Sequence, residues 1–189
     1  MSNVIEQYLH ALNEYEEVSP NDRSLPNPYN FRSLELDPKV TEDDWKKASK
    51  PWKERPFAEE TDVKQSFLGS KRNTAKAWVI IDGRRRVGIV GSQTFWGFPI
   101  KAPQGHGNLV FVTWVRGKKY AARGIMKMLN LPFFDQGPKA YFRIEIYKEN
   151  KASIATAKLL KASPGRHNGS IVFGLRPPYW WNGDKILKY

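Results

Sequence analysis

Two spacings of hydrophobic residues alternate along the chain, and together they predict a succession of strands and helices. Alternating apolar and polar residues, or a short apolar run, predict strands at residues 31–36, 75–81, 86–90, 109–115, 140–147, 170–175 and 184–189. Apolar residues three and four positions apart predict helices at residues 3–17, 41–50, 59–67, 122–131 and 151–162. The interleaved order predicts an α/β fold with a mixed sheet.

Individual residues mark where several of these elements begin and end. Thr41 is suited to cap a helix, because its hydroxyl can accept a hydrogen bond from a backbone N–H group of the first turn. Asp43 and Asp44 fall in that first turn, where negative charge is favoured. Pro51 is expected to end this helix, and Pro132 is expected to end or bend the helix that begins near residue 122.

Glycine and proline mark the turns and loops. The dipeptide Asp82-Gly83 lies between two apolar runs and predicts a tight hairpin. Residues 92–107 contain several Gly and Pro residues and predict a loop that is long for a compact domain, and loops of that length are often functional. A shorter loop is predicted at residues 164–169.

The stretch at residues 109–131 combines a buried strand, a basic turn and the start of a helix. The turn, residues 116–123, contains Gly117 and four cations, and Gly124 follows it. The first turn of a helix has unpaired N–H groups and a positive dipole end, so such a turn can bind a diphosphate. Gly124 would let that diphosphate approach the backbone. The alternative is a strand–helix connection that is basic without binding anything.

Charge is distributed unevenly along the 189 residues. Residues 1–62 carry 8 Lys/Arg and 14 Asp/Glu, whereas residues 63–189 carry 23 and 5, and the whole chain has a formal charge of +12. A basic surface of this size predicts an acidic partner, which can be a phosphate-rich cofactor, a nucleic acid or an acidic protein. The alternative is a basic face that is only solvated.

Composition excludes several classes of protein and site. The chain has no Cys, which rules out disulfides and thiolate metal sites, and we expect no metal site. No apolar run reaches the length of a membrane span, so no membrane association is expected. The acidic N-terminal residues do not resemble a signal peptide, so a cytoplasmic protein is expected.

Four segments resemble the GNAT (Gcn5-related N-acetyltransferase) family of acyl-CoA N-acyltransferases, most closely the branch that includes the ribosomal-protein N-terminal acetyltransferases. Residues 77–91 (AWVIIDGRRRVGIVG) resemble the family's second and third strands. Residues 111–129 (FVTWVRGKKYAARGIMKML) resemble its fourth strand, pyrophosphate loop and third helix. Residues 142–160 (FRIEIYKENKASIATAKLL) resemble its fifth strand and next helix, and residues 180–189 (WWNGDKILKY) resemble its closing strand.

The resemblance spans residues 31–189 and implies one GNAT-like acyltransferase domain. Its sheet would be mixed and mostly antiparallel, with flanking helices. Residues 1–30 would form an acidic N-terminal helical extension. The implied activity is transfer of an acetyl (acyl) group from acetyl-CoA to an amine on a macromolecular acceptor, either a protein or a nucleic acid.

The resemblance also implies where acetyl-CoA, the co-substrate, would bind. Its diphosphate would lie at the helix start and its pantetheine arm along the preceding strand. The residues implied for cofactor binding are Val112, Trp114, Val115, Lys118, Lys119, Ala122, Arg123, Gly124, Ile125, Asn150 and Ser153.

Acyl transfer also needs a base for the substrate ammonium and an acid for the leaving thiolate. The candidate catalytic residues are Glu145 and His106. Purely structural alternatives exist for several of these residues. Asn150 is a preferred helix N-cap, Glu145 can form a surface pair with Arg143, and His106 can be an exposed loop residue.

The pyrophosphate-loop motif departs from the family pattern of Gln/Arg-x-x-Gly-x-Gly/Ala. Its first and last positions are Ala121 and Met126, and only Gly124 matches. Ala157 stands where many members have a tyrosine acid. These departures support an alternative function, in which a catalytically degenerate GNAT-like module binds nucleic acid or an acidic protein through its basic face.

Overall fold

The computed structural model describes residues 33–55, 62–68, 75–93, 106–134, 141–160, 162–167 and 170–175. The predicted helix at residues 3–17, the extension at residues 1–30 and the closing strand at residues 184–189 lie outside these residues.

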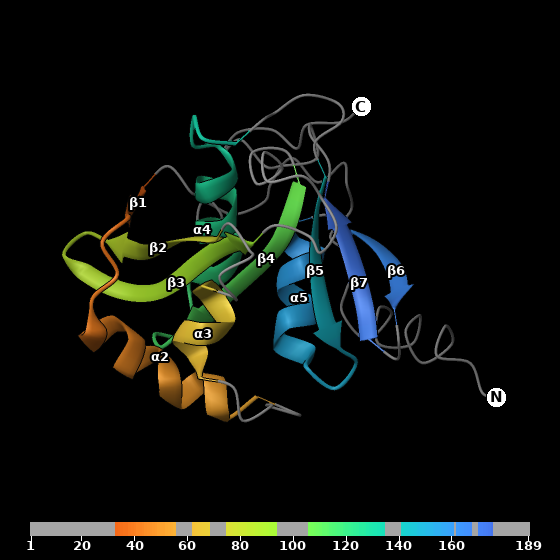
Figure 1. Ribbon diagram of the computed structural model, residues 1–189, viewed down its shortest axis with the longest axis horizontal. Helices are drawn as coiled ribbons and strands as arrows, with labels where there is room; N and C mark the ends of the chain where they lie inside the picture. Colours follow the sequence, from red (N-terminus) through yellow and green to blue (C-terminus); the bar gives the residue numbers. More distant parts are fainter. Residues whose placement is uncertain are drawn as a thin grey trace.

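A seven-stranded sheet crosses the described part of the chain, with helices on both of its faces (Figure 1). The strand order is β1-β2-β3-β4-β5-β7-β6; β4 and β5 pair in parallel, and the other pairs are antiparallel. The strands are β1 (Leu34–Asp37), β2 (Ala75–Asp82), β3 (Arg85–Gln93), β4 (His106–Thr113), β5 (Tyr141–Tyr147), β6 (Ser163–His167) and β7 (Ser170–Leu175). The helices are α2 (Glu42–Lys53), α3 (Val63–Leu68), α4 (Tyr120–Leu129) and α5 (Lys151–Leu159). The predicted mixed, mostly antiparallel sheet is confirmed.

The two faces of the sheet bury separate hydrophobic clusters. On one face, α4 and α5 cover a cluster that includes Ile80, Val90 and Phe142. On the other face, α2 and α3 cover a smaller cluster that includes Val79, Ile89 and Val112. Neighbouring residues of one strand therefore face different helices, as the period of two in a strand requires. Because both faces of the central strands are covered, these strands appear as continuous apolar runs in the sequence.

Helix α2 begins as the sequence predicts and ends later. The Thr41 hydroxyl accepts a hydrogen bond from the Asp44 amide, and the Asp44 carboxylate accepts one from the Thr41 amide. The helix then continues through Pro51, which was expected to end it. Trp45 and Trp52, seven residues apart, both pack into the cluster under α2. Their burial outweighs the local cost of a proline near the end of the helix.

Other boundaries differ from the sequence prediction as well. A strand, β6, occupies residues 163–167 where a loop was predicted, and its Pro164 is tolerated because β6 is an edge strand of the described sheet. Strand β4 begins at His106 inside the predicted loop. Helix α4 begins at Tyr120, two residues earlier than predicted. The hairpin at Asp82-Gly83 is confirmed, with Asp82 paired to Arg85.

The sheet opens between its two parallel strands. Strands β4 and β5 pair only through His106, Gly107 and Asn108 of β4, and they diverge toward the lower part of Figure 1. Strand β4 remains paired with β3 up to Thr113, and β5 remains paired with β7 up to Tyr147. Beyond Asn108, no described strand pairs with the edge of β4 that faces the opening. The opening therefore exposes strand backbone groups inside the fold.

Candidate functional site

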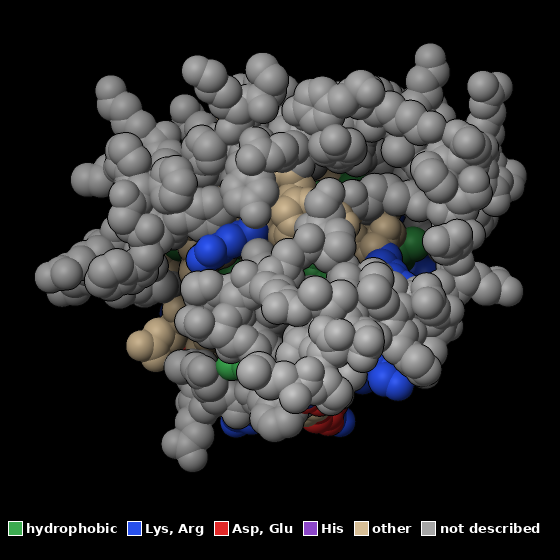
Figure 2. All heavy atoms as spheres, turned by 90° about the vertical axis from the view of Figure 1, so that its right-hand side faces the viewer, with side chains coloured by type: hydrophobic (Ala, Val, Ile, Leu, Met, Phe, Trp, Pro, Cys, Tyr) green, Lys and Arg blue, Asp and Glu red, His purple; other side chains and the backbone are tan. Residues whose placement is uncertain are grey.

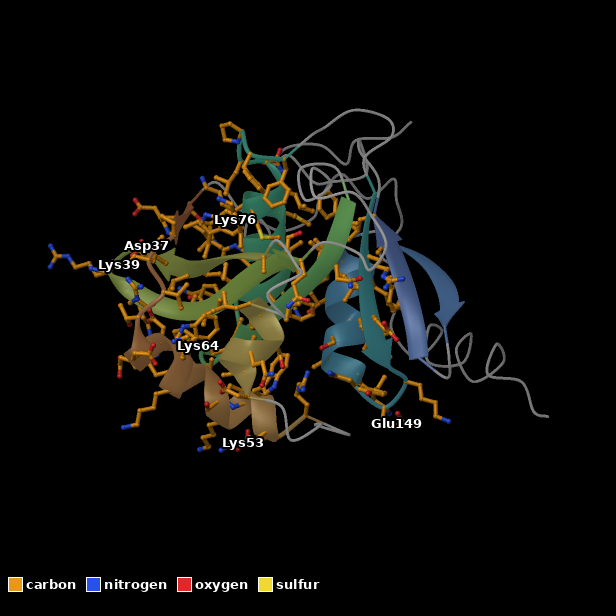
Figure 3. All side chains as sticks on the ribbon, viewed as in Figure 1. Asp37, Lys39, Lys53, Lys64, Lys76 and Glu149 are labelled. Atoms are coloured by element: carbon orange, nitrogen blue, oxygen red, sulfur yellow. The ribbon has the colours of Figure 1, made fainter. Side chains whose placement is uncertain are left out.

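A cavity of about 600 Å³ lies at this opening. Four parts of the chain meet there: the end of α2, the second half of β4 with the turn into α4, the first residues of α4, and the first two turns of α5. Figure 3 shows Lys53 at the end of α2 and Glu149 at the turn into α5, both along the lower edge of the molecule. The cavity is thus built from segments that are far apart in sequence.

The start of α4 forms one wall of the cavity. Lys119 is its N-cap residue, with a left-handed backbone (φ 54°), and no side chain caps the helix. The Arg123 amide donates to the Lys119 carbonyl oxygen, which closes the first helical turn. The preceding amides of Tyr120, Ala121 and Ala122 belong to the orphan donors of a helix start. These N–H groups and the helix dipole together favour an anion at this wall.

The start of α5 forms the wall across the opening. The Asn150 side chain accepts a hydrogen bond from the Ser153 amide at 3.2 Å, so Asn150 is the N-cap of this helix. Asn150 and Ser153 both line the cavity. Two helix starts therefore border one cavity, and the positive ends of both dipoles add at the same place.

The charged residues that line the cavity are predominantly basic. The cations are Arg55, Arg116, Lys119 and Lys151, and the acids are Glu54 and Glu149. Arg116, Lys119 and Lys151 are exposed to solvent. Both the backbone dipoles and the side chains thus make the cavity suited to a negatively charged ligand.

Six of the residues implied for cofactor binding line this cavity. They are Val112, Val115, Lys119, Ala122, Asn150 and Ser153. Val112 and Val115 lie along and just beyond β4, and the other four lie at the two helix starts. The structure therefore brings together the strand and both strand-to-helix turns that the sequence indicated.

Arg123, Gly124 and Ile125 were also implied for cofactor binding, but these three positions face the protein interior. Arg123 is 5% exposed, and its guanidinium donates to the Lys118 carbonyl oxygen and the Ser33 hydroxyl. Ile125 is fully buried. A Cβ atom at Gly124 would lie 2.4 Å from the Ile80 Cδ1 atom, so this glycine allows α4 to lie close to the sheet.

Trp114 and Lys118 also lie outside the lining of the cavity. The Trp114 indole packs against the cluster under α2 and donates to the Arg86 carbonyl oxygen at 2.9 Å. The Lys118 ammonium lies 3.6 Å from the Asp82 carboxylate. Both side chains are therefore directed to the sheet side of the turn.

Of the two candidate catalytic residues, Glu145 does not line the cavity. Glu145 is exposed, and it lies on the face of β5 opposite to the buried Ile144 and Ile146. His106 begins β4, six residues before Val112, which is roughly 20 Å along an extended strand. The His106 side chain lies outside the described part of the structure. Within that part, no cluster of three or more potential metal ligands is present, and no helix is long and apolar enough to span a membrane.

The end of α2 contributes residues that the sequence did not indicate. Trp52 and Arg55 line the cavity, and the Arg55 guanidinium carbon lies 3.3 Å from the centre of the Trp52 ring. The Arg55 Nε atom also donates to the Trp52 carbonyl oxygen. The seven-residue spacing of Trp45 and Trp52 was a signal that the helix passes Pro51. No local pattern, however, linked α2 to β4.

Three solved structures show what this chain is similar to. The GNAT domain of S. lividans PAT has a TM-score of 0.52 and 13% sequence identity, covering 75% of this chain and 88% of that chain. An acetyltransferase from Thermus thermophilus has a TM-score of 0.51 and 13% identity, covering 77% and 98%. A Vibrio cholerae protein named as a putative ribosomal-protein-serine acetyltransferase has a TM-score of 0.52 and 16% identity, covering 77% and 95%.

These similarities show that the chain has the GNAT acyltransferase fold, as the sequence resemblance predicted. Comparison of the sequence with protein-family models and with curated proteins finds no match. At sequence identities of 13 to 16% the similarity concerns the fold, so the activity and the ribosomal-protein branch stay predictions.

Proposed function

We propose that the protein is an N-acyltransferase that binds acetyl-CoA in the cavity between β4 and α5 and transfers the acetyl group to an amine. The observation that carries this proposal is the opening of the sheet, which places between two helix starts an edge of β4 that no described strand pairs with beyond Asn108. An extended ligand in which an arm with amide groups is followed by a diphosphate matches both features.

The residues present fit two parts of the cofactor, its diphosphate and its pantetheine arm. The diphosphate would accept hydrogen bonds from the amides of Tyr120, Ala121 and Ala122, and Lys119 and Arg116 would add attraction. The amides of the pantetheine arm would pair with the edge of β4 beyond Asn108, as an added strand does. The cofactor supplies the activated thioester, and the chain supplies its binding and orientation.

Two departures from the family motif do not obstruct this fit. Met126 is 1% exposed and packs in the core beneath α4, so its side chain does not crowd the diphosphate. Ala121 lines the cavity and leaves the amides around it accessible. The absence of a large side chain at Ala121 therefore fits a ligand contacted through backbone groups.

The acceptor in this proposal is an acidic macromolecule that approaches along α2. Lys46, Lys50 and Lys53 are exposed and share one face of the helix, at spacings of four and three residues. Lys53 is followed directly by Glu54 and Arg55, which line the cavity. A polyanion bound along these lysines would therefore end beside the reacting site.

The proposal is tested with an Ala121→Glu variant. A carboxylate at this position would occupy the place of the diphosphate, so the affinity for acetyl-CoA is expected to fall at least about 100-fold. Negative charge in the first turn of a helix stabilises the fold by roughly 0.3–1 kcal/mol. Calorimetry with acetyl-CoA and a thermal unfolding scan should thus show lost binding without lost stability.

The matched control is Ala121→Gln, which has the same size and no charge. It should retain most of the affinity, because it lacks the negative charge that repels the diphosphate. If wild-type protein shows no binding at millimolar acetyl-CoA, or if Ala121→Glu binds as well as wild type, the proposed site is wrong.

One observation favours a second candidate function, a GNAT-like module that binds without catalysis. Ala157 is fully buried in the core, so no phenol stands at the position of the family's tyrosine acid. Tyr120 lines the cavity, but its hydroxyl donates to the Asp82 carboxylate. Binding of acetyl-CoA without acetyl transfer to any tested acidic protein or nucleic acid would favour this second function.

A further inference from the structure

The turn before α4 has an unusual backbone. Gly117, Lys118 and Lys119 have φ angles of 89°, 50° and 54°, so three consecutive residues have positive φ. For the two lysines this conformation is disfavoured, because their Cβ atoms approach backbone carbonyl oxygens. Such a turn persists only where surrounding contacts hold it, and residues of this kind cluster at ligand-binding sites.

Arg123 provides the first of these contacts. It lies one helical turn beyond Lys119, and its Nη1 atom reaches back to donate to the Lys118 carbonyl oxygen at 3.0 Å. Its Nη2 atom donates to the Ser33 hydroxyl at 2.8 Å, just before β1. Burial lowers the pKa of Arg123, and attraction to Asp82 and Tyr120 opposes that effect. The Arg123 guanidinium thus holds the carbonyl group of Lys118, whose backbone is left-handed, by a hydrogen bond from inside the protein.

Asp82 and Tyr120 provide the second contact. Asp82 ends β2 at the hairpin, and its Oδ2 atom accepts a hydrogen bond from the Tyr120 hydroxyl at 2.5 Å. The Lys118 ammonium lies 3.6 Å from the same oxygen atom. Tyr120 is the first residue of α4, so this bond ties the start of the helix to the rigid hairpin. The Tyr120 hydroxyl and the Lys118 ammonium offset the negative charge of Asp82. Asp82 is not part of the cavity lining.

We propose that Asp82, Tyr120 and Arg123 are positioning residues that hold the turn at residues 117–119 in its binding shape before a ligand arrives. This inference rests on the proposed function of the cavity. We call the contacts of these three residues the brace, and the brace keeps the amides of Tyr120, Ala121 and Ala122 directed at the ligand. It takes over the role of the polar and small residues that the family motif has before and after Gly124. A turn that is already formed loses little entropy on binding, which raises affinity.

Loss of the brace and loss of a purely structural contact would affect ligand affinity differently. A structural contact lowers stability and leaves the affinity of the folded molecules unchanged for every ligand. A brace on the turn changes the affinity only for ligands that reach the turn. Coenzyme A reaches it with its diphosphate, whereas pantetheine carries the same arm without a phosphate.

The test compares both ligands in Tyr120→Phe, which removes the donor hydroxyl, and in Asp82→Leu, which removes the acceptor carboxylate. We expect calorimetry to show that coenzyme A binds about tenfold more weakly to both variants, in line with the loss of one charged hydrogen bond. Pantetheine, measured by competition, should change by less than about twofold. Asp37→Asn is the control, because it removes a carboxylate from the end of β1, where Asp37 pairs with Arg86.

Equal loss of affinity for both ligands, or no loss for either, would overturn the brace. If wild-type protein does not bind coenzyme A at all, the proposed function fails, and hydrogen exchange of the free protein then decides the inference. The Arg123 amide, which is bonded to the Lys119 carbonyl oxygen, should exchange about tenfold faster in Tyr120→Phe than in wild type or Asp37→Asn. Unchanged exchange at this amide would refute the brace whatever the ligand is.

Discussion

Gly124 shows how one residue can be indicated by the sequence for one reason and required by the structure for another. Next to a basic turn, its lack of a side chain suggests close approach of a phosphate. In the structure the space for a Cβ atom is filled by Ile80, with Cδ1 at 2.4 Å and Cγ1 at 2.8 Å, and by Val90 at 3.2 Å. The glycine therefore allows α4 to pack closely on β2 and β3.

A Gly124→Ala variant is expected to be destabilised, by up to about 2 kcal/mol. Helix propensity alone would favour alanine by about 1 kcal/mol, but overpacking a tight core costs roughly 1–3 kcal/mol and forces Ile80 from its rotamer. Urea unfolding measures the difference. Because Ile80→Val removes the Cδ1 atom, the double variant should recover part of the loss relative to Ile80→Val alone. A Gly124→Ala protein as stable as wild type would contradict this packing.

The shift of Arg123 and Gly124 away from the cavity has a simple physical origin. The apolar spacing placed the start of the helix at residue 122, and capping residues were absent from the turn. The helix starts at Tyr120 instead. An offset of two residues rotates every later side chain by about 200° around the helix axis. Sequence reasoning located this helix start, but it did not locate which residues of the helix face the ligand.

At the scale of elements, Arg86 joins three parts of the fold. Its guanidinium donates to both oxygens of Asp44 in α2 at 2.8 Å, to Asp37 at the end of β1 at 3.0 Å, and to the Lys39 carbonyl oxygen at 2.9 Å. The Asp44 side chain is 1% exposed. Burial by itself would raise the pKa of Asp44, but the hydrogen bonds from Arg86 and Thr41 hold it below the ordinary value of 3.8.

This cluster makes the stability depend on acidic pH. Because the pKa of Asp44 is lower in the folded than in the unfolded protein, the unfolded chain binds more protons near pH 4, and stability rises with pH. The contribution is complete above about pH 5 and is lost as the pH falls through the folded pKa. Asp44→Asn should therefore lose about 2 kcal/mol at pH 7, with a difference from wild type that shrinks toward pH 2.

Chemical unfolding at several pH values measures this difference. The control is Asp43→Asn, which removes the neighbouring exposed carboxylate that pairs with Lys47; a change of at most about 0.5 kcal/mol is expected. A constant difference between Asp44→Asn and wild type from pH 7 to pH 2 would contradict the assigned role of the ion pair.

Elements were predictable from sequence where a local signal and the tertiary structure agree. The capping box at Thr41 and Asp44 and the hairpin at Asp82-Gly83 depend on neighbouring residues, and both are present. The continuation of α2 through Pro51 depends on Trp52 packing against Phe67, and the extension of β4 to His106 depends on pairing with β5. The pairing of β4 with β5 has no local pattern, and at Pro51 the spacing of Trp45 and Trp52 conflicts with a proline that normally ends a helix, so the sequence does not give either boundary.

At the scale of the whole molecule, basic residues reach the surface in several regions. On the face shown in Figure 2, Lys and Arg side chains of the described residues appear at separate places and Asp and Glu only near the lower rim. Lys53 directly precedes Glu54 and Arg55 of the cavity lining, so the role of the α2 lysines can be tested apart from the total charge of +12. An acidic acceptor would neutralise them as it binds, releasing counterions.

Salt titrations of binding test this acceptor surface. With single-stranded RNA as the probe, replacing Lys46, Lys50 and Lys53 by Gln should reduce the slope of log affinity against log salt by about 2, since each neutralised phosphate contributes roughly 0.7. Polyglutamate is the second probe, and its binding should weaken in the same variant. The control is Lys39→Gln, because Lys39 lies just after β1, as Figure 3 shows. This variant should leave the salt dependence of RNA binding and the affinity for polyglutamate unchanged. An unchanged slope for both probes would exclude this surface.

The central claim is that acetyl-CoA lies in the open sheet with its diphosphate on the first turn of α4. The most direct measurement is a titration of ¹⁵N-labelled protein with acetyl-CoA, followed through the backbone amide signals. This placement of the ligand predicts saturable shifts that are largest at Tyr120, Ala121 and Ala122, with a second group along β4 near Val112. Saturable shifts confined to other parts of the chain, or none at millimolar acetyl-CoA, would contradict it.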